Sequence, residues 1–209
     1  MKLLSFSTLI FAAVTIYFEY YNRQLLWVFK PATILLIIAL AWVYGEKRGF
    51  YRWAILAGLV FSLIGDIFLI NPQTYFIQGL LSFFLAHLCY IFAFYKSSEK
   101  FNLLSLTAFI VGILILVSVF AGVPDNLKIA VIFYTLAIST MLCFATNFWL
   151  TKGNTRSLDA ICGATLFVIS DSIIAFNKFS YEFFSAKILI LITYFIAQWL
   201  IARSLKRHV

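Results

Sequence analysis

Eight apolar segments, separated by short connections, restrict the fold of this chain more than any other feature of its sequence. Each is long enough to cross a hydrocarbon core of about 30 Å as a helix that rises about 1.5 Å per residue. Lipid offers the backbone no hydrogen-bond partner, so a helix is the expected form of each crossing. The segments are Leu3–Phe18, Leu25–Tyr44, Tyr51–Ile70, Tyr75–Tyr95, Leu103–Phe120, Leu127–Leu150, Ser157–Asn177 and Phe183–Ala202. The sequence therefore predicts an all-α integral membrane protein, an eight-transmembrane-helix bundle in which residues 1–209 form a single membrane-embedded domain.

The composition agrees with this fold class and excludes two others. Hydrophobic residues make up 64% of the chain and charged residues 11%, whereas soluble domains carry about 25% charged residues. A water-soluble globular domain is therefore excluded, and so is a disordered chain, which needs low hydrophobicity. The net charge of +8 is expected to orient the chain in the bilayer. The bilayer is thus the predicted partner, and no nucleic acid is expected.

The distribution of Lys and Arg predicts which side of the membrane holds the termini. With eight crossings, both termini and three connections share one side, which holds eleven of the 16 Lys and Arg residues. The other side holds five: Arg23, Lys30, Lys128, Lys178 and Lys187. Because cytoplasmic connections carry the excess of positive charge, we predict that both termini are cytoplasmic. The short connections suit a bacterial inner membrane, with an internal membrane as the alternative.

Two segments four helices apart resemble each other. In the third and in the seventh, a Gly stands eight residues before an Asp, and a small residue immediately precedes the Asp. The matching residues are Gly58, Gly65 and Asp66 in one segment and Gly163, Ser170 and Asp171 in the other. Both segments run outward from the cytoplasm, which is consistent with a parallel duplication of a four-helix half. Each Asp is expected about 20 Å from the cytoplasmic edge, so the two carboxyl groups lie at one depth.

Asp66 and Asp171 are the deepest acids of the sequence. An acid inside the membrane costs at least about 2.5–3.5 kcal/mol on insertion scales, so it indicates a functional site. The alternative is that each Asp only ties helices together by hydrogen bonds. Two carboxyl groups in one poorly solvated site share a proton between them, which supplies an acid and a base together. We therefore predict that Asp66 and Asp171 form a catalytic acid–base pair.

Other polar groups are placed within reach of this pair. Lys30 lies just before Pro31 near the outer edge. It either snorkels to the interface or acts as a cation that favours the ionised form of a carboxyl group or holds a phosphate. His87 and Tyr90 are three residues apart and share one helix face, as do Tyr194 and Gln198, which are four apart. A structural role remains the alternative for each, and for the last two it is helix–helix hydrogen bonding.

Three further charged residues lie near the ends of the segments, where water can solvate a charge at little cost in free energy. They are Glu19, Asp159 and Lys178, and we interpret them as surface groups. The three cysteines lack the spacing of a metal site, and the chain has only two His residues. No metal or other cofactor is therefore predicted.

Five weak motifs occur in order along the chain. They are Lys30-Pro31, Gly65-Asp66 followed by Ile-Phe-Leu, His87-x-x-Tyr90-x-x-x-Phe94, Gly163-Ala164 through Ser170-Asp171 to Ala175, and Tyr194 with Ala197-Gln198. Together they resemble the YhhN-like lysoplasmalogenases, a family of multi-pass membrane hydrolases, over nearly the whole chain. The resemblance implies hydrolysis of the vinyl ether bond of lysoplasmalogens to a fatty aldehyde and glycerophosphocholine or glycerophosphoethanolamine. It also implies that Asp66 and Asp171 carry the reaction, with a lysophospholipid as substrate.

A vinyl ether hydrolyses by protonation at carbon, so it needs an acid, an anion near the resulting cation and a base for water. Glycosidases meet similar needs with two carboxyl groups. The predicted substrate-binding or supporting residues are Lys30, His87, Tyr90, Ser170, Tyr194 and Gln198. Which Asp is the acid, the head-group and chain-length preference, and the oligomeric state stay open.

Three other functions are compatible with buried polar groups in a membrane. An intramembrane aspartyl protease has a Gly-x-Gly-Asp motif, but Leu63 replaces the first Gly here. A zinc-dependent hydrolase needs several His ligands, and one of the two, His208, lies in the predicted cytoplasmic tail. The main alternative is a small membrane transporter or lipid-binding protein in which the two Asp residues relay protons.

Overall fold

The structure is a computed structural model that describes residues 2–44 and 49–206. These residues form eight α-helices, two short 3-10 helices and no strand. The α-helices are α1 (Lys2–Tyr21), α2 (Leu26–Tyr44), α3 (Phe50–Phe68), α4 (Pro72–Ser97), α5 (Thr107–Phe120), α6 (Asp125–Lys152), α7 (Thr155–Phe179) and α8 (Ala186–Arg203). The 3-10 helices η1 (Arg23–Leu25) and η2 (Leu103–Leu106) precede α2 and α5. Each predicted segment corresponds to one helix, so the predicted all-α bundle is confirmed.

All eight helical stretches of the described chain are long and apolar enough to cross a membrane. The protein is therefore a multi-pass membrane protein. Gly45, Lys47 and Arg48, which belong to the first connection on the side of the termini, lie outside the described residues.

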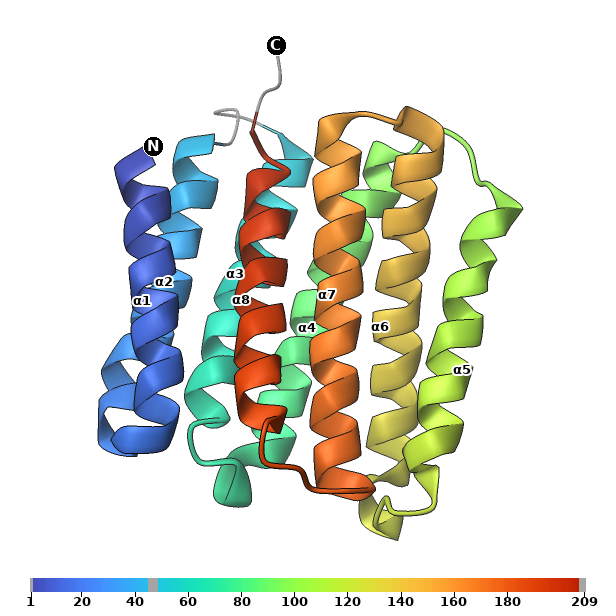
Figure 1. The fold of residues 1–209 in the computed structure, drawn as a ribbon. Helices are drawn as coiled ribbons and strands as arrows, with labels where there is room; N and C mark the ends of the chain where they lie inside the picture. Colours follow the sequence, from blue (N-terminus) through green and yellow to red (C-terminus); the bar gives the residue numbers. More distant parts are fainter. Residues whose placement is uncertain (1, 45–48, 207–209) are drawn as a thin grey trace.

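Successive helices run in opposite directions, so both termini lie at one end of the bundle (Figure 1). We call this the terminal end and the opposite one the distal end. Helices α3, α4, α7 and α8 occupy the middle, with α1 and α2 on one flank and α5 and α6 on the other (Figure 1). These four central helices therefore carry most of the predicted site residues.

Local sequence signals explain where several helices begin and end. Pro72 stands at the first turn of α4, where its missing N–H is not needed. The Asn154 side chain accepts from the Ser157 backbone N–H, and the Ser157 hydroxyl oxygen accepts from the Asn154 N–H, which caps α7. Gly153 ends α6 with φ of +59°, a left-handed conformation that glycine adopts at little cost. These caps fix the start of α7 and hence the level of Asp171 in the bundle.

The repeated glycines bring helices of the central group close together. A Cβ atom on Gly58 would lie 2.3 Å from the Tyr90 ring of α4, and one on Gly163 would lie 2.8 Å from Ile201 of α8. Each Gly thus lets its helix pack closely against the helix that follows it in the chain. The two Gly-containing segments therefore pack in a similar way.

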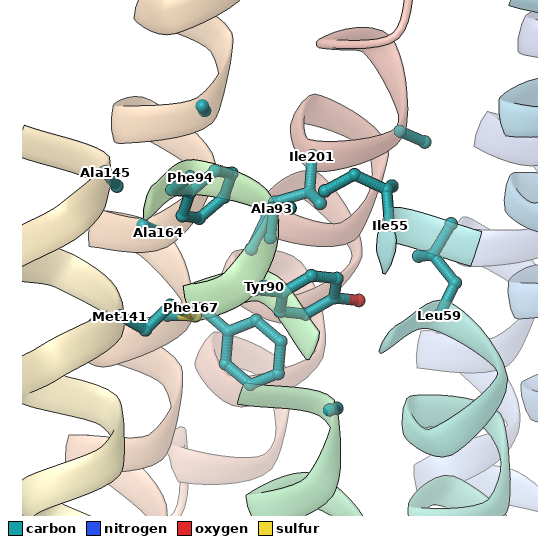
Figure 2. Packing of buried hydrophobic residues seen from close by; sticks show 14 of the residues in the cluster. Ile55, Leu59, Tyr90, Ala93, Phe94, Met141, Ala145, Ala164, Phe167 and Ile201 are labelled. Carbon is teal, nitrogen blue, oxygen red and sulfur yellow. The ribbon is translucent and has the colours of Figure 1, made fainter. Parts of the chain in front are cut away.

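A hydrophobic core lies between the central helices. Figure 2 shows Tyr90, Phe94, Phe167 and Met141 packed together, and all four side chains are fully buried. Aromatic rings from α4 and α7 therefore fill the middle of the bundle on the terminal side of the two Asp residues. The large aromatic fraction of the sequence is in part this core.

One sequence interpretation is wrong. Asp159 is not a surface group: only 1% of it is exposed, and its carboxylate accepts two hydrogen bonds from the Arg203 guanidinium, one of them at 2.8 Å from Nε. It lies in the second turn of α7, and the last turn of α8 brings Arg203 to it. The pair joins the two helices at the terminal end, where a charge buried alone would be costly.

Candidate active site

A cavity of about 390 Å³ lies in the distal half of the bundle, and both Asp66 and Asp171 line it. Its volume falls within the range of about 300–1,000 Å³ that is usual for ligand pockets. Each Asp is the seventeenth residue of its helix, because α3 begins at Phe50 and α7 at Thr155. The two side chains therefore lie at similar levels and face one cavity.

The cavity wall contains charges of both signs. The charged lining residues are Glu19, Arg23, Lys30, Asp66, Asp171, Lys178, Glu182 and Lys187. Four are basic and four are acidic. Most of those outside the pair lie close to the distal connections, so the polar end of a ligand would meet them there.

Asp66 has a hydrogen-bond partner on each carboxylate oxygen. Oδ1 lies 3.0 Å from Nζ of Lys30, and the Tyr194 hydroxyl donates to Oδ2 at 2.6 Å. The side chain is 2% exposed. The carboxylate therefore lies in a buried ion pair that joins α2, α3 and α8.

Asp171 has a different environment. The Tyr134 hydroxyl of α6 donates to Oδ2, and Nε2 of His87 lies 3.4 Å from the same oxygen. Nε2 is also 3.0 Å from the Tyr134 oxygen, so the three side chains form a cluster across α4, α6 and α7. Within the described chain, Oδ1 of Asp171 has no hydrogen-bond partner. The Asp171 side chain is 13% exposed, more than that of Asp66.

His87 is fully buried and held on two sides by aromatic rings. Its ring centroid lies 4.8 Å from that of Phe167 and 5.2 Å from that of Tyr134, both in edge-on geometry. Nδ1 has no hydrogen-bond partner among the residues that the structure describes. The orientation of the imidazole is thus set by packing and by the contacts of Nε2.

The remaining predicted residues, Tyr90, Ser170 and Gln198, do not contact either carboxylate, and only Ser170 lines the cavity. The Tyr90 hydroxyl donates to Oε1 of Gln198 at 2.9 Å and lies 3.5 Å from the Ser62 hydroxyl. The Ser170 hydroxyl lines the cavity and donates to the Ile190 carbonyl at 3.2 Å. Tyr90 and Gln198 thus cross-link α4 and α8, and Ser170 links α7 to α8.

A smaller, mainly apolar pocket adjoins the polar cavity. Its lining comes from α4, α5, α6 and α7, together with Leu69 at the end of α3, and includes Tyr134 and Ala175. The two cavities share Leu69, Phe76, Phe83, Asp171 and Ile174. Asp171 therefore lies where a polar and an apolar compartment meet.

Tyr134 is the site residue that sequence reasoning missed. It is one of eleven Tyr residues, and no other titratable residue lies within four positions of it in its apolar segment. The available signal is its distance along the helix from the distal end. Tyr134 stands nine residues after the start of α6, and Asp171 stands eight residues before the end of the neighbouring α7, so both lie at a similar level. Matching levels on adjacent helices indicate a contact only once the packing order of the helices is known.

These features define a class: a helical membrane protein in which one buried and one partly buried carboxyl group line a polar cavity that adjoins an apolar pocket. The chain belongs to the YhhN family, whose sequence model matches residues 25–205. It is 29% identical over 181 residues to the uncharacterized membrane protein YhhN of Escherichia coli O157:H7, with 86% of each chain covered.

Two mammalian relatives are similar over most of the chain. Lysoplasmalogenase TMEM86B of Rattus norvegicus is 30% identical over 178 residues, which cover 85% of this chain and 72% of the relative. Lysoplasmalogenase TMEM86B of Homo sapiens is 32% identical over 178 residues, which cover 85% of this chain and 74% of the relative. No solved structure matches the chain significantly.

Proposed function

We propose that this protein is a lysoplasmalogenase: a membrane hydrolase that cleaves the vinyl ether bond of lysoplasmalogens to a fatty aldehyde and a glycerophosphodiester. Its relatives of about 30% identity that carry this name support the proposal. The structural observation that carries it is the position of the two carboxyl groups. Asp66 and Asp171 face one cavity, and Asp171 also lines the apolar pocket beside it.

The two compartments suit the two halves of a lysoplasmalogen. The glycerophosphate head group is polar and charged, and it matches the cavity whose wall holds Arg23, Lys178 and Lys187. The alkenyl chain is apolar and matches the adjoining apolar pocket. The vinyl ether joins these two halves, so a lysolipid bound in this way has its reactive bond beside Asp171.

The surrounding residues supply the chemistry that this bond requires. Protonation at carbon gives an oxocarbenium ion, which water converts into a hemiacetal that collapses to aldehyde and alcohol. A carboxyl group positioned as general acid contributes about 10²- to 10⁴-fold in rate, and a carboxylate nearby stabilises the cation. Lys30 has two N–H donors beyond the one it gives Asp66, and they are available to a substrate phosphate.

The test uses purified protein with three lysolipids that share a head group and differ in the linkage: vinyl ether, ester and saturated alkyl ether. We expect fatty aldehyde from the vinyl ether alone. In deuterium oxide, the aldehyde should gain one deuterium on the carbon next to the carbonyl. Ester cleavage at an equal rate, or proton-coupled uptake into liposomes without hydrolysis, contradicts the proposal and favours a different membrane function.

A substitution that fills the apolar pocket should change the preference of the protein for the length of the substrate's alkenyl chain. Ala175 lines the pocket one helical turn after Asp171, and Ala175→Phe places a ring in the space proposed for the alkenyl chain. We expect kcat/KM for a long-chain substrate to fall about 10-fold, because losing apolar contact of this size costs about 1–3 kcal/mol.

A short-chain alkenyl substrate should be affected much less by Ala175→Phe. The matched control is Cys162→Phe on the same helix, where the side chain is exposed on the outside of the bundle. If Ala175→Phe lowers kcat/KM equally for long-chain and short-chain substrates, the pocket does not hold the alkenyl chain.

We also propose that both termini are cytoplasmic, that the distal end faces outward in a bacterial inner membrane, and that the two halves arose by duplication. The shared end of the termini in Figure 1 and the excess of Lys and Arg on that side support this topology. A fluorescent protein that folds only in the cytoplasm, fused after residue 209, should fluoresce. A dark fusion that is otherwise intact contradicts the orientation.

A further inference from the structure

The two carboxyl groups of the site differ in how their oxygens are used. Both oxygens of Asp66 are occupied, one by Lys30 and the other by Tyr194. On Asp171, by contrast, the contacts of Tyr134 and His87 converge on Oδ2 alone. Oδ1 of Asp171 is left without a partner in the described part of the chain, on a residue that lines both cavities.

We propose that Asp171 is the residue that exchanges protons with the substrate, and that Tyr134 and His87 are positioning residues that hold its Oδ2 so that Oδ1 faces the vinyl ether. The proposal rests on the proposed hydrolysis and assigns its roles. Asp66, held by Lys30, stays ionised and stabilises the cationic intermediate without giving or taking a proton.

The balance of charge in the site supports this division of roles. Asp66 and Lys30 neutralise each other, whereas no Lys or Arg of the described chain lies within ion-pair distance of Asp171. An ionised Asp171 would therefore have a cationic partner within this distance only if His87 were protonated. A protonated Asp171 needs no such partner, and its Oδ2 still accepts from Tyr134 while Oδ1 carries the proton.

The buried imidazole agrees with a neutral cluster. A cationic His87 would carry a proton on each ring nitrogen, and the one on Nδ1 would be buried without an acceptor. With the proton on Nε2 alone, only a lone pair is left unpartnered, which is the more tolerable case for a buried polar atom. Nε2–H then donates toward the Tyr134 oxygen, and Tyr134 donates to Asp171.

The reaction balances with water as the only co-reactant. Asp171 gives its Oδ1 proton to the double-bond carbon remote from oxygen, and the double-bond electron pair forms the new C–H bond. Water adds to the carbon next to oxygen, and the Asp171 carboxylate takes a proton from it. The hemiacetal then loses its hydroxyl proton as the bond to the glycerol oxygen breaks and that oxygen is protonated. Asp171 ends in the state in which it began.

The test compares Tyr134→Phe with a matched control. Tyr134→Phe removes the donor to Asp171 and keeps the ring. We expect kcat to fall about 100-fold with KM within about threefold, because a displaced reacting group costs about this factor. Tyr51→Phe makes the same change in another buried Tyr, whose hydroxyl lies 2.7 Å from that of Ser204 at the terminal end. This control should hydrolyse the substrate at the wild-type rate per folded molecule.

Two further measurements separate positioning from loss of folded protein. His87→Gln keeps an N–H donor near the place of Nε2 and should recover most of the activity that His87→Leu loses. The solvent deuterium isotope effect on kcat should change in Tyr134→Phe, whereas partial unfolding would leave it as in the wild type.

A folded Tyr134→Phe variant with wild-type kcat, or one with lower kcat and an unchanged isotope effect, overturns the proposed positioning role. If His87→Gln is as inactive as His87→Leu, the role of His87 is wrong. The wild-type protein is assayed first on the vinyl ether substrate. Absence of hydrolysis there contradicts the proposed function itself, so the two failures are distinguishable.

Discussion

Asp171→Asn is expected to lower the rate of fatty aldehyde release by about 1,000-fold or more. An amide has nearly the shape of a carboxyl group, and its oxygen can still accept from Tyr134. It cannot give a proton to carbon or take one from water, so the whole acid–base contribution of this residue is lost. The measurement is aldehyde release from purified protein, with substrate well above KM.

The control for this prediction is Asp125→Asn at the first turn of α6. This Asp is exposed, pairs with Lys128 at 2.6 Å and lies outside both cavities, so the rate should stay as in the wild type. Unfolding of Asp171→Asn is checked separately by thermal denaturation in detergent. A folded Asp171→Asn that retains a tenth of the wild-type rate is incompatible with an essential acid at this position.

Lys30→Met is expected to destabilise the protein by about 3–5 kcal/mol. The substitution leaves the Asp66 carboxylate buried with no cation beside it, and breaking one side of a buried ion pair typically costs this much. Asp66→Asn leaves the Lys30 ammonium unpaired and should be destabilising as well. The free energy of unfolding in detergent micelles measures both effects.

The double substitution Lys30→Met with Asp66→Asn should recover most of this stability, because neither charge remains and Asn can still accept from Tyr194. With Asp171 intact, it should also keep measurable turnover, unlike Asp171→Asn. Lys128→Met, which removes the cation of an exposed pair, is the control and should change stability little. If the two single losses add in the double variant, Lys30 and Asp66 do not stabilise each other.

The helices themselves were predictable from the sequence. The apolar runs are long, and in lipid the backbone has few alternatives to a helix, so existence, number and approximate ends follow from local composition. The ends differ mostly by a few residues: the last helix begins at Ala186, whereas the apolar run begins at Phe183. The depth of Asp66 and Asp171 also followed, since depth is only a count of residues along a helix.

The contacts around the two acids were predictable only in part. The sequence selected Lys30, His87 and Tyr194, and all three contact one of the two carboxyl groups. It did not indicate which residue contacts which carboxyl group or that Tyr90 donates to Gln198, and its interpretation of the buried Asp159 as a surface group was wrong. Those contacts depend on how each helix is rotated about its axis and on which helix is its neighbour.

The sequence by itself therefore determined the fold class, the levels of the buried acids and the family, because each of these depends on residues counted along one chain. Only the tertiary structure decided that Tyr134 joins His87 at Asp171 and that a polar and an apolar compartment share this residue. The physical reason is that α4, α6 and α7 meet through side-chain packing. Because these helices are almost equally apolar, the sequence of one helix does not indicate which helix packs against it.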